Sequence, residues 1–243
     1  MNTRRRPAAS NVSPRPQGQS LRPGGLPTGQ AHGQAEQAAR QVARTAAQEV
    51  RILGGQWRRT PLPVPVSAGL RPTPSRVRET LFNWLGQDLS GWRVLDAFAG
   101  SGALGLEAAS RGAEQAVLLE REAALVRPLR AVASKLKADM VQVHQADALA
   151  WMAQPAQAAC FDLVLLDPPF DEGLFLKALA AAMKAVTAGG WVYLEAPQPW
   201  SALLAQADNA AAGDFSRLRL HKAGHAGAVH FHLFQCMAEA TSP

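Results

Sequence analysis

The sequence predicts an α/β fold built on a mostly parallel, Rossmann-like sheet of seven strands. From residue 91 onward, short apolar runs alternate with segments of helical pattern, and a glycine-rich loop follows the first run. Strands separated by helices pair in parallel through right-handed crossovers. The last two runs instead flank a Gly-containing turn, so we expect the sheet to end in an antiparallel C-terminal hairpin.

Composition indicates one main core with an appendage. The chain has 243 residues, of which 47% are hydrophobic, and a formal net charge of +6. This charge suits a polyanionic partner, but it also suits a simple soluble cation. Cys160 and Cys236 make no disulfide or zinc framework, and no apolar run reaches the ~20 residues that span a bilayer. With no secretory signal, we expect a cytoplasmic protein without a membrane segment.

Three regions follow one another along the chain. Residues 1–48 are rich in Pro, Gly, Gln, Ala and Arg, which predicts a disordered basic tail. Residues 49–90 are expected to form a small N-terminal extension that packs on the core. It consists of a hairpin turning at Gly54-Gly55 and a helix capped by Thr73 or Ser75. Residues 91–238 form the main domain.

Strands and helices alternate in the main domain. The expected strands lie in 92–98, 116–122, 141–147, 161–170 with its terminal turn, and 189–197. The expected helices between them lie in 102–110, 123–136, 148–153 and 174–186. The final hairpin is expected within residues 215–235, where two alternating runs surround the turn.

A glycine loop follows the first strand of this domain. Gly100, Gly102 and Gly105 form a G-x-G-x-x-G pattern between a strand and a helix, which lets a nucleotide-like ligand approach the backbone at a helix N-terminus. Glycines at such a junction also occur for packing alone, so the pattern does not identify the ligand.

Four carboxylates follow the strands, and we expect them at one rim of the sheet: Asp96, Glu120, Asp147 and Asp167. Glu120 can accept two ribose hydroxyls, which fits NAD or S-adenosylmethionine. Asp96 would oppose a pyrophosphate but could orient a ligand with an ammonium and a sulfonium. Its alternative role is to bond loop N–H groups, and that of Asp147 is to cap the next helix.

The turn Asp167-Pro168-Pro169-Phe170 presents acceptors only, because prolines have no N–H. The Asp167 carboxylate and the Pro168 carbonyl can each accept one N–H of a nucleobase's exocyclic amine, and Phe170 can stack on the base. The alternatives are a helix cap for Asp167 and a hydrophobic plug for Phe170.

Four stretches together resemble one protein family: RILGGQWRRTPLPVP, LRPTPSRVRETLFNWL, LDAFAGSGALGLEAASRGA and FDLVLLDPPF. They are similar to the RsmD family of bacterial 16S rRNA guanine-N2 methyltransferases. The resemblance implies a Rossmann-like, S-adenosylmethionine-dependent enzyme that methylates the N2 amine of one guanine, numbered 966, during small-subunit maturation. It implies that the cofactor is held by Asp96, Phe98, Gly100, Ser101, Gly102, Glu120, Asp147, Arg71 and Thr73, with Asp167 to Phe170 as catalytic residues.

The segment before the main domain is basic, which favours contacts with RNA phosphates; its arginines are Arg51, Arg58, Arg59, Arg71, Arg76 and Arg78. Its candidate RNA-binding residues are Arg51, Trp57, Arg58, Arg59 and Arg76, and by resemblance Pro72 and Glu79 also build the site. A solvated basic face with Trp57 in a minor core is the alternative. The histidines lack metal-ligand spacing, so no metal site is expected. The expected partner is 16S rRNA within the 30S subunit or an assembly intermediate, bound by a monomer.

Three other functions remain open at this point. DPPF suits any exocyclic amine, so an N6-adenine DNA methyltransferase is possible. A non-catalytic RNA-binding assembly factor would keep the fold without methyl transfer. An NAD oxidoreductase would bind a nicotinamide at the same glycine loop.

Overall fold

The structure is a computed structural model that describes residues 49–63, 73–170, 173–205 and 215–238. All of these belong to one unit, residues 44–243. The expected basic tail, residues 1–48, lies outside the described residues, as do Arg71 and Pro72.

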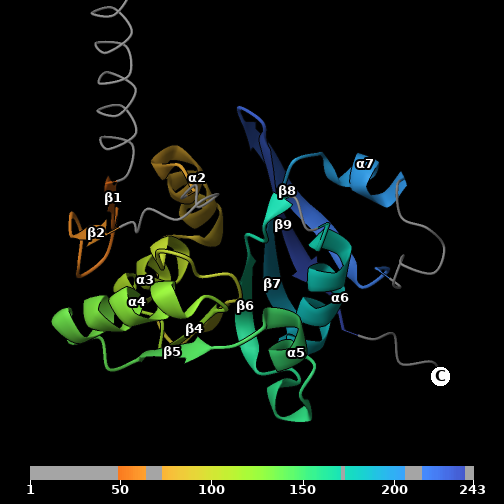
Figure 1. Cartoon of the computed structure of the whole chain (residues 1–243). Coiled ribbons are helices and arrows are strands. Elements are labelled where there is room, and N and C mark those ends of the chain that lie inside the picture. The colour runs from red at the N-terminus through yellow and green to blue at the C-terminus, as the bar shows by residue number, and fades with distance from the viewer. Residues whose placement is uncertain (1–48, 64–72, 171–172, 206–214, 239–243) are drawn as a thin grey trace, which may run out of the picture. The chain divides into compact units, whose positions relative to one another are not determined.

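A twisted sheet of seven strands forms the centre of the described part of the chain (Figure 1). Its strand order is β5-β4-β3-β6-β7-β9-β8. The first five strands pair in parallel, and β9 pairs antiparallel with both β7 and β8. The expected α/β fold with a C-terminal antiparallel hairpin is therefore confirmed. The bounds are β3 (Arg93–Asp96), β4 (Gln115–Glu120), β5 (Val141–Gln145), β6 (Phe161–Leu166), β7 (Val186–Ala196), β8 (Leu218–Ala226) and β9 (Val229–Cys236).

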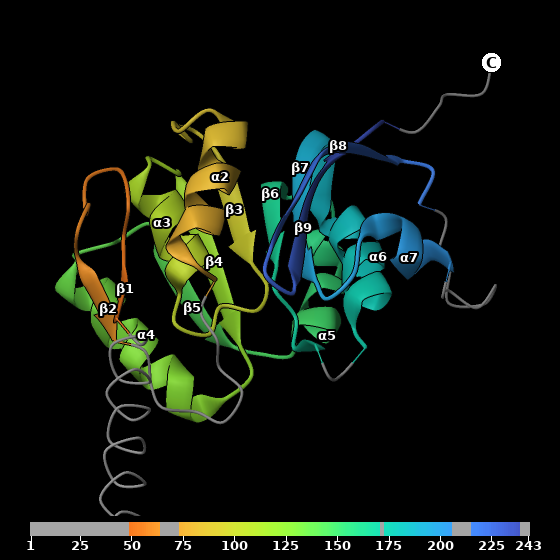
Figure 2. The same ribbon diagram turned by 90° about the horizontal axis from the view of Figure 1, so that it is seen from above.

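Helices cover both faces of the sheet (Figure 2). One face carries α2 (Ser75–Leu85), α3 (Ala103–Ser110) and α4 (Ala123–Lys135). The other carries α5 (Ala148–Met152), α6 (Phe175–Ala185) and α7 (Trp200–Ala205), with a short 3-10 turn at Pro155–Gln157. The sequence did not predict α7, whose Trp200 ring packs edge-on against Phe215 and Phe234.

Side chains of the central strands alternate between these two faces, as strand geometry requires. In β6, Leu163 and Leu165 belong to the core beneath α2 and α3. Val164 and Leu166 belong to the core beneath α5 and α6. The face on which a strand-end side chain lies therefore follows from its position along the strand.

A small hairpin covers the outer side of α3. Its strands β1 (Glu49–Arg51) and β2 (Pro61–Pro63) pair antiparallel, and Ile52 and Leu62 pack with α3 in one apolar core. Every residue of α3 is buried as a result. The connection runs from residue 52 to residue 60, and Gly55 within it has a φ of +72°. A Cβ at Gly55 would lie 1.7 Å from the Ser110 carbonyl oxygen, so close packing on α3 also requires this glycine.

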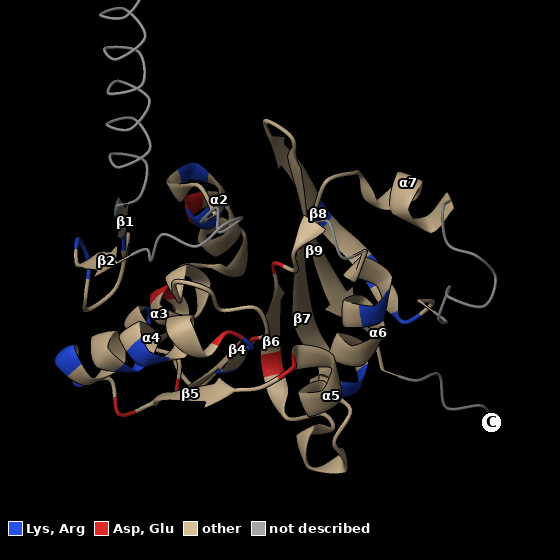
Figure 3. Ribbon diagram, in the orientation of Figure 1, with Lys and Arg blue, Asp and Glu red and all other residues tan. Residues whose placement is uncertain are grey.

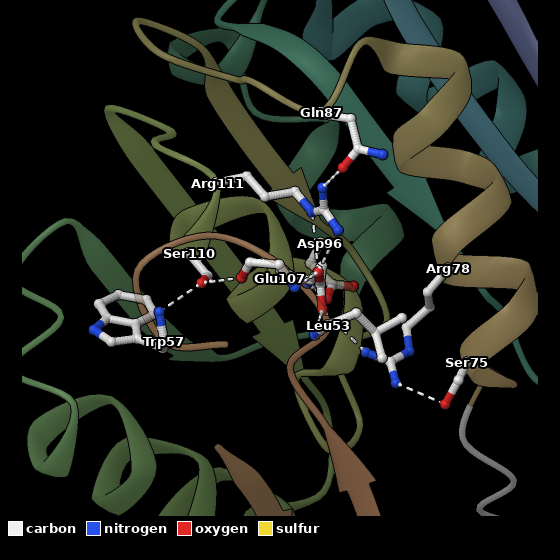
Figure 4. A network of polar contacts seen from close by, with 11 residues as sticks. Leu53, Trp57, Ser75, Arg78, Gln87, Asp96, Glu107, Ser110 and Arg111 are labelled. Atoms are coloured by element: carbon white, nitrogen blue, oxygen red, sulfur yellow. Dashed lines mark hydrogen bonds and ion pairs between the residues drawn. The ribbon is translucent and has the colours of Figure 1, made fainter. Parts of the chain in front are cut away.

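A buried ion network joins this hairpin to α2 and α3 (Figure 4). The Glu107 carboxylate accepts the backbone N–H groups of Leu53 and Gly54 at 2.7 and 2.8 Å. It also pairs with Arg78 at 3.2 Å and Arg111 at 2.8 Å. Arg78 is fully buried, so grouping it with the basic, phosphate-contacting arginines was wrong. A carboxylate buried at this depth needs such partners to offset its loss of hydration.

The expected side-chain cap of α2 is also wrong. Pro74 is the residue at the N-cap, and no side chain bonds a first-turn N–H. Ser75 is already helical, and its hydroxyl accepts from Arg78 Nη2 at 3.5 Å. The hydroxyl of Thr73 instead contacts two carboxyl groups at the end of the sheet.

Candidate active site

The candidate site lies where the strand order reverses. From β3 the chain proceeds to β4 and β5 on one side, and it then returns to β6 and β7 on the other. Asp96 ends β3, and Asp167 directly follows β6. In open α/β sheets, ligands bind at this reversal, outside the carboxyl ends of the strands. Figure 3, in which Asp and Glu are red, shows acidic positions near β4 and β6 in this central part of the sheet.

Strand register brings a third carboxylate to this place. Asp96 on β3 pairs with Leu165 on β6, and Leu165 pairs with Tyr193 on β7. Two residues further along each of the last two strands, Asp167 and Glu195 stand on the same face. That face is the one covered by α2 and α3, because Leu165 and Tyr193 belong to the core beneath those helices.

The Thr73 hydroxyl bridges Asp167 and Glu195, and a second hydroxyl, that of Tyr193, contacts Glu195. Thr73 Oγ1 lies 3.3 Å from Asp167 Oδ2 and 2.9 Å from Glu195 Oε1. The Tyr193 hydroxyl donates to Glu195 Oε1 at 2.9 Å. Sequence analysis missed Glu195. The signal that could have identified it is a single carboxylate near the end of the apolar run WVYLEA, in the strand that follows α6.

Burial makes this cluster hold protons unusually tightly. Burial raises the pKa of Asp96 to about 7. It also raises the pKa of Asp167 to about 6, against a lowering by the hydrogen bond from Thr73. The pKa of Glu195 rises to about 8 because it is buried and because Asp167 is a nearby like charge. Burial, and then the neighbouring Glu195 carboxyl group, raise the pKa of Tyr193.

The glycine loop bends directly over Asp96. Gly100 and Gly102 have φ angles of +50° and +77°, in the region that glycine adopts without strain. Gly105 lets α3 approach β3, because a Cβ there would lie 3.0 Å from the Asp96 Cβ atom. Asp96 Oδ2 accepts the Gly105 N–H at 2.8 Å. One oxygen thus fills the alternative role of bonding the loop. The buried Oδ1 has no partner within hydrogen-bond distance, although the Phe98 N–H acts on the carboxyl group and lowers its pKa.

The next two predicted acids also bond backbone groups. Glu120 Oε2 accepts the Gly100 N–H at 2.9 Å, and its Oε1 accepts the Glu122 N–H at 2.7 Å. Asp147 caps α5 by accepting the Ala150 N–H at 2.8 Å, which was its alternative role. Both side chains keep access to solvent and a second lone pair on each oxygen. Each could therefore still accept a ligand hydroxyl or amine.

The remaining predicted loop residues differ in exposure. Phe98 is half-buried against the core beneath α5 and α6, and Ser101 is buried beside the glycines. Glu79 lies exposed on α2.

The DPPF turn places an aromatic ring at the surface. Asp167 remains partly open to solvent, Pro168 is buried, and Pro169 is exposed. The Phe170 side chain is 38% exposed and meets the Phe175 ring edge-on at 5.7 Å between centroids. Phe170 is therefore not a buried plug, and part of its ring surface can contact another molecule.

The predicted RNA-binding residues of the extension are mostly at the surface. Arg51, Arg58, Arg59 and Arg76 are exposed, with Arg51 Nη1 donating to the Arg59 carbonyl at 3.4 Å. Trp57 is half-buried against the apolar core under the hairpin. Arg71, assigned to the cofactor site, lies outside the described residues.

The described residues hold neither a metal-binding cluster nor a membrane-spanning helix. No group of three or more His, Cys, Asp and Glu side chains in this part of the chain is arranged to hold a metal ion. Across the same residues, no helix is both long and apolar enough to cross a membrane. His232 is buried and hydrogen-bonded: its Nε2 accepts the Trp200 N–H at 3.0 Å.

Comparison with known proteins gives consistent matches. The family described as "Conserved hypothetical protein 95" matches residues 50–235. Ribosomal RNA small subunit methyltransferase D of Escherichia coli (strain K12) is 39% identical over 194 residues, which cover 80% of this chain and 93% of that protein. The protein of the same name from Haemophilus influenzae is 43% identical over 137 residues, covering 56% of this chain and 71% of its own length.

Solved structures show the same fold. A putative methyltransferase, yhhF, from Escherichia coli superposes with a TM-score of 0.67 at 36% identity, covering 79% of this chain and 99% of that one. An RNA methyltransferase from Salinibacter ruber, solved in complex with S-adenosyl-L-homocysteine, has a TM-score of 0.51 at 18% identity, covering 71% and 97%. At that identity, the second match supports the fold alone.

Proposed function

Since this chain belongs to the RsmD family of small-subunit ribosomal RNA methyltransferases, we propose that it methylates the exocyclic N2 amine of one guanine in 16S rRNA. The proposed target is the guanine numbered 966, and the proposed methyl donor is S-adenosylmethionine. The relatives' names support methylation of small-subunit rRNA. The choice of guanine and of its N2 atom rests on the resemblance and on the chemistry of the site.

One observation carries the proposal. On the two sides of the strand reversal stand a buried acceptor without a partner, Asp96 Oδ1, and a partly exposed carboxylate, Asp167. An unpaired buried acceptor is costly unless a ligand supplies a donor. The ammonium group of S-adenosylmethionine is such a donor, and its positive charge suits an acidic site. Asp167 is then left to accept from a second molecule.

The residues present fit the proposed cofactor. Asp96 would accept from its ammonium group, while the backbone at Gly100 to Gly102 would lie against it without side-chain interference. Glu120 would accept ribose hydroxyls, and Asp147 the adenine amine. Phe98, Ser101, Thr73 and Arg71 would complete this pocket. When bound, S-adenosylmethionine supplies a methyl carbon that its sulfonium already activates.

The DPPF turn would hold the base. The Asp167 carboxylate and the Pro168 carbonyl would each accept one N–H of the amine and so fix its orientation. The exposed Phe170 ring would stack on the base, which must lie in a loop or be extruded from its helix. Positioning is the main task of these side chains, and Asp167 need not be a strong base.

The rest of the chain would bind the RNA around that base. Residues 49–90 would act as the RNA-contacting extension, with phosphates bound by Arg51, Arg58, Arg59 and Arg76 and a base or sugar packed on Trp57. Residues 91–238 would form the methyltransferase domain. We propose that a monomer acts in the cytoplasm on the 30S subunit or an assembly intermediate.

One assay tests this proposal. The protein is incubated with S-adenosylmethionine labelled in its methyl group and, in separate reactions, naked 16S rRNA, 30S particles or DNA, and the methylated base is then located. We expect label at N2 of a single guanine in the rRNA. Label at adenine N6 in DNA would support the DNA enzyme instead. Cofactor binding without transfer to any RNA would support a non-catalytic assembly factor.

Two matched variants sharpen the assay. Asp167→Ala is expected to keep cofactor affinity and lose about 100-fold or more in turnover, since it removes the acceptor that orients the amine. Asp139→Asn, at an exposed carboxylate away from the strand reversal, should behave as wild type. Equal turnover by both variants would contradict the role given to Asp167.

A further inference from the structure

The Thr73 hydroxyl raises a problem of proton counting. It lies within hydrogen-bond distance of Asp167 Oδ2, at 3.3 Å, and of Glu195 Oε1, at 2.9 Å. A hydroxyl has one proton, so it can donate to only one carboxylate at a time. Both contacts are favourable only if the other carboxyl group is protonated and donates to Thr73. The geometry therefore implies one proton more than two ionised carboxylates would carry.

Among the described residues, no cation pairs directly with Glu195. It is 2% exposed, and the acidic groups around it are Asp96 and Asp167. From α2, the Arg78 guanidinium acts on it electrostatically, but it bonds Glu107 at 3.2 Å. Tyr193 of the same strand donates a neutral hydrogen bond.

The neighbouring strand adds no charge on this side. In β9, Phe231 is the residue opposite Glu195, and His232 is opposite Leu194. Because side chains alternate, His232 lies on the other face of the sheet. Like carboxylates this close, in a dry site, do not both ionise readily.

We propose that Glu195 is a positioning residue that shares a single proton with Asp167 through the Thr73 hydroxyl, which fixes the Asp167 carboxylate toward the substrate amine. The negative charge resides on Asp167, because that member of the pair retains access to water and Glu195 does not. The proton lies on Glu195, which donates to Thr73, and Thr73 donates to Asp167. This inference rests on the proposed function, since it assigns a task to the same site.

The pair also accounts for the proton released by the reaction. Methylation forms one N–C bond and breaks one S–C bond, whose electrons go to sulfur, and it leaves the nitrogen with one proton in excess. Asp167 can take that proton while Glu195 stays neutral, so Asp167 and Glu195 never both carry a negative charge. The proton then leaves to solvent from Asp167, the member that is only partly buried.

Carbon NMR tests the shared proton without RNA or cofactor. The protein is labelled with ¹³C in its Asp and Glu carboxyl groups, and the Asp167 resonance is followed against pH in wild type and in Glu195→Gln. In wild type we expect at least two titration steps, because coupled groups report each other's ionisation. In Glu195→Gln we expect the step that reports Glu195 to disappear, while a step from Asp96, which also acts on Asp167, remains. The same titration steps with the same midpoints in both proteins would overturn the proposal.

Turnover of matched variants tests the positioning role. Glu195→Gln, which keeps a neutral donor to Thr73, should lose no more than about tenfold in kcat, whereas Glu195→Ala should lose about 100-fold. Should Glu195→Ala not fold, Thr73→Val compared with Thr73→Ser gives the same contrast, with Val impaired and Ser active. Equal loss in both members of a pair would overturn the role. A wild-type protein that methylates no RNA would defeat the proposed function instead, and the NMR result would stand apart from it.

Discussion

The backbone N–H of Gly105 donates a 2.8 Å hydrogen bond to Asp96 Oδ2, and this bond leaves the other oxygen of the same carboxyl group buried without a partner. The bond fixes the carboxyl group against the first turn of α3. Gly105 permits the approach because a Cβ at this position would meet Leu118 Cδ1 at 2.8 Å. Helix packing and, under the proposed function, cofactor binding thus depend on the same carboxyl group.

Cofactor affinity should depend on pH through Asp96. Burial raises its pKa to about 7, so below that pH the group is mostly neutral and must lose a proton to pair with an ammonium. We expect affinity for S-adenosylmethionine to rise by roughly tenfold per pH unit as pH approaches 7, and then to level off. Calorimetry at pH 6 in buffers of different ionisation enthalpy should show about one proton released per cofactor bound. An affinity flat across this range would contradict the assignment.

Without cofactor, the effect of pH on the stability of the folded protein should run in the opposite direction to its effect on cofactor affinity. A carboxyl group whose pKa is raised by folding stabilises the folded state most at pH values below its unfolded pKa of 3.8. This contribution is lost as pH rises through about 7. Cofactor should therefore raise the unfolding temperature more at pH 8 than at pH 6.

Two glycines with positive φ should differ sharply in their tolerance of alanine. At Gly86, where φ is +96° and nothing lies within 4 Å of a Cβ, alanine should cost about 1 kcal/mol of conformational strain. At Gly102, where φ is +77°, a Cβ would also lie 2.4 Å from Leu129 Cδ1. Overpacking should add about 1–3 kcal/mol there and weaken cofactor binding. Urea unfolding of both variants measures the difference in their free energies of unfolding. Equal losses of stability would contradict the predicted clash with Leu129.

Sequence patterns predicted the parts of the site that lie in contiguous motifs. The glycine loop and DPPF each combine a strand end with a turn, so their places at one rim followed from the parallel sheet. Glu195 has no such motif. Its role depends on β7 lying beside β6 and on Thr73 reaching over from before α2, and both are tertiary facts.

Arg78 was misassigned for a related reason. It stands in a run of arginines that is typical of a solvated or phosphate-binding surface. It is nevertheless one turn before Phe82 on the buried face of α2, and its partner Glu107 lies on another helix. At Arg78, local composition and long-range packing disagreed. The helix α7 was not predicted; it has only six residues and directly follows Pro199.

Replacing Glu107 should destabilise the whole chain. In Glu107→Gln, Arg78 and Arg111 lose the carboxylate that pairs with them, and two hairpin N–H groups lose a charged acceptor. Breaking a buried ion pair on one side typically costs about 3–5 kcal/mol. Urea unfolding should show a loss of this size, against almost none for the exposed control Glu114→Gln. A loss below about 1 kcal/mol would show that the network contributes little.

Replacing Phe170 should weaken the use of RNA as substrate without changing cofactor affinity. Its ring is 38% exposed, and stacking on a base is worth about 1–3 kcal/mol, so Phe170→Ala should lower kcat/KM for rRNA by roughly 5- to 150-fold. Affinity for S-adenosylmethionine, measured by calorimetry, should change little. Phe170→Tyr should restore most of the loss, because it keeps an aromatic face.

A control separates stacking from simple loss of apolar surface. Leu220, on β8, is 41% exposed, and Leu220→Ala removes a similar exposed apolar side chain away from the strand reversal. Its kcat/KM should match wild type. The edge-on contact with Phe175 could also make Phe170 a local support for the turn. In that case Phe170→Ala would lower the unfolding temperature and kcat together, and Phe170→Tyr would restore both. The KM for RNA would stay constant. A constant KM is therefore the result that excludes stacking.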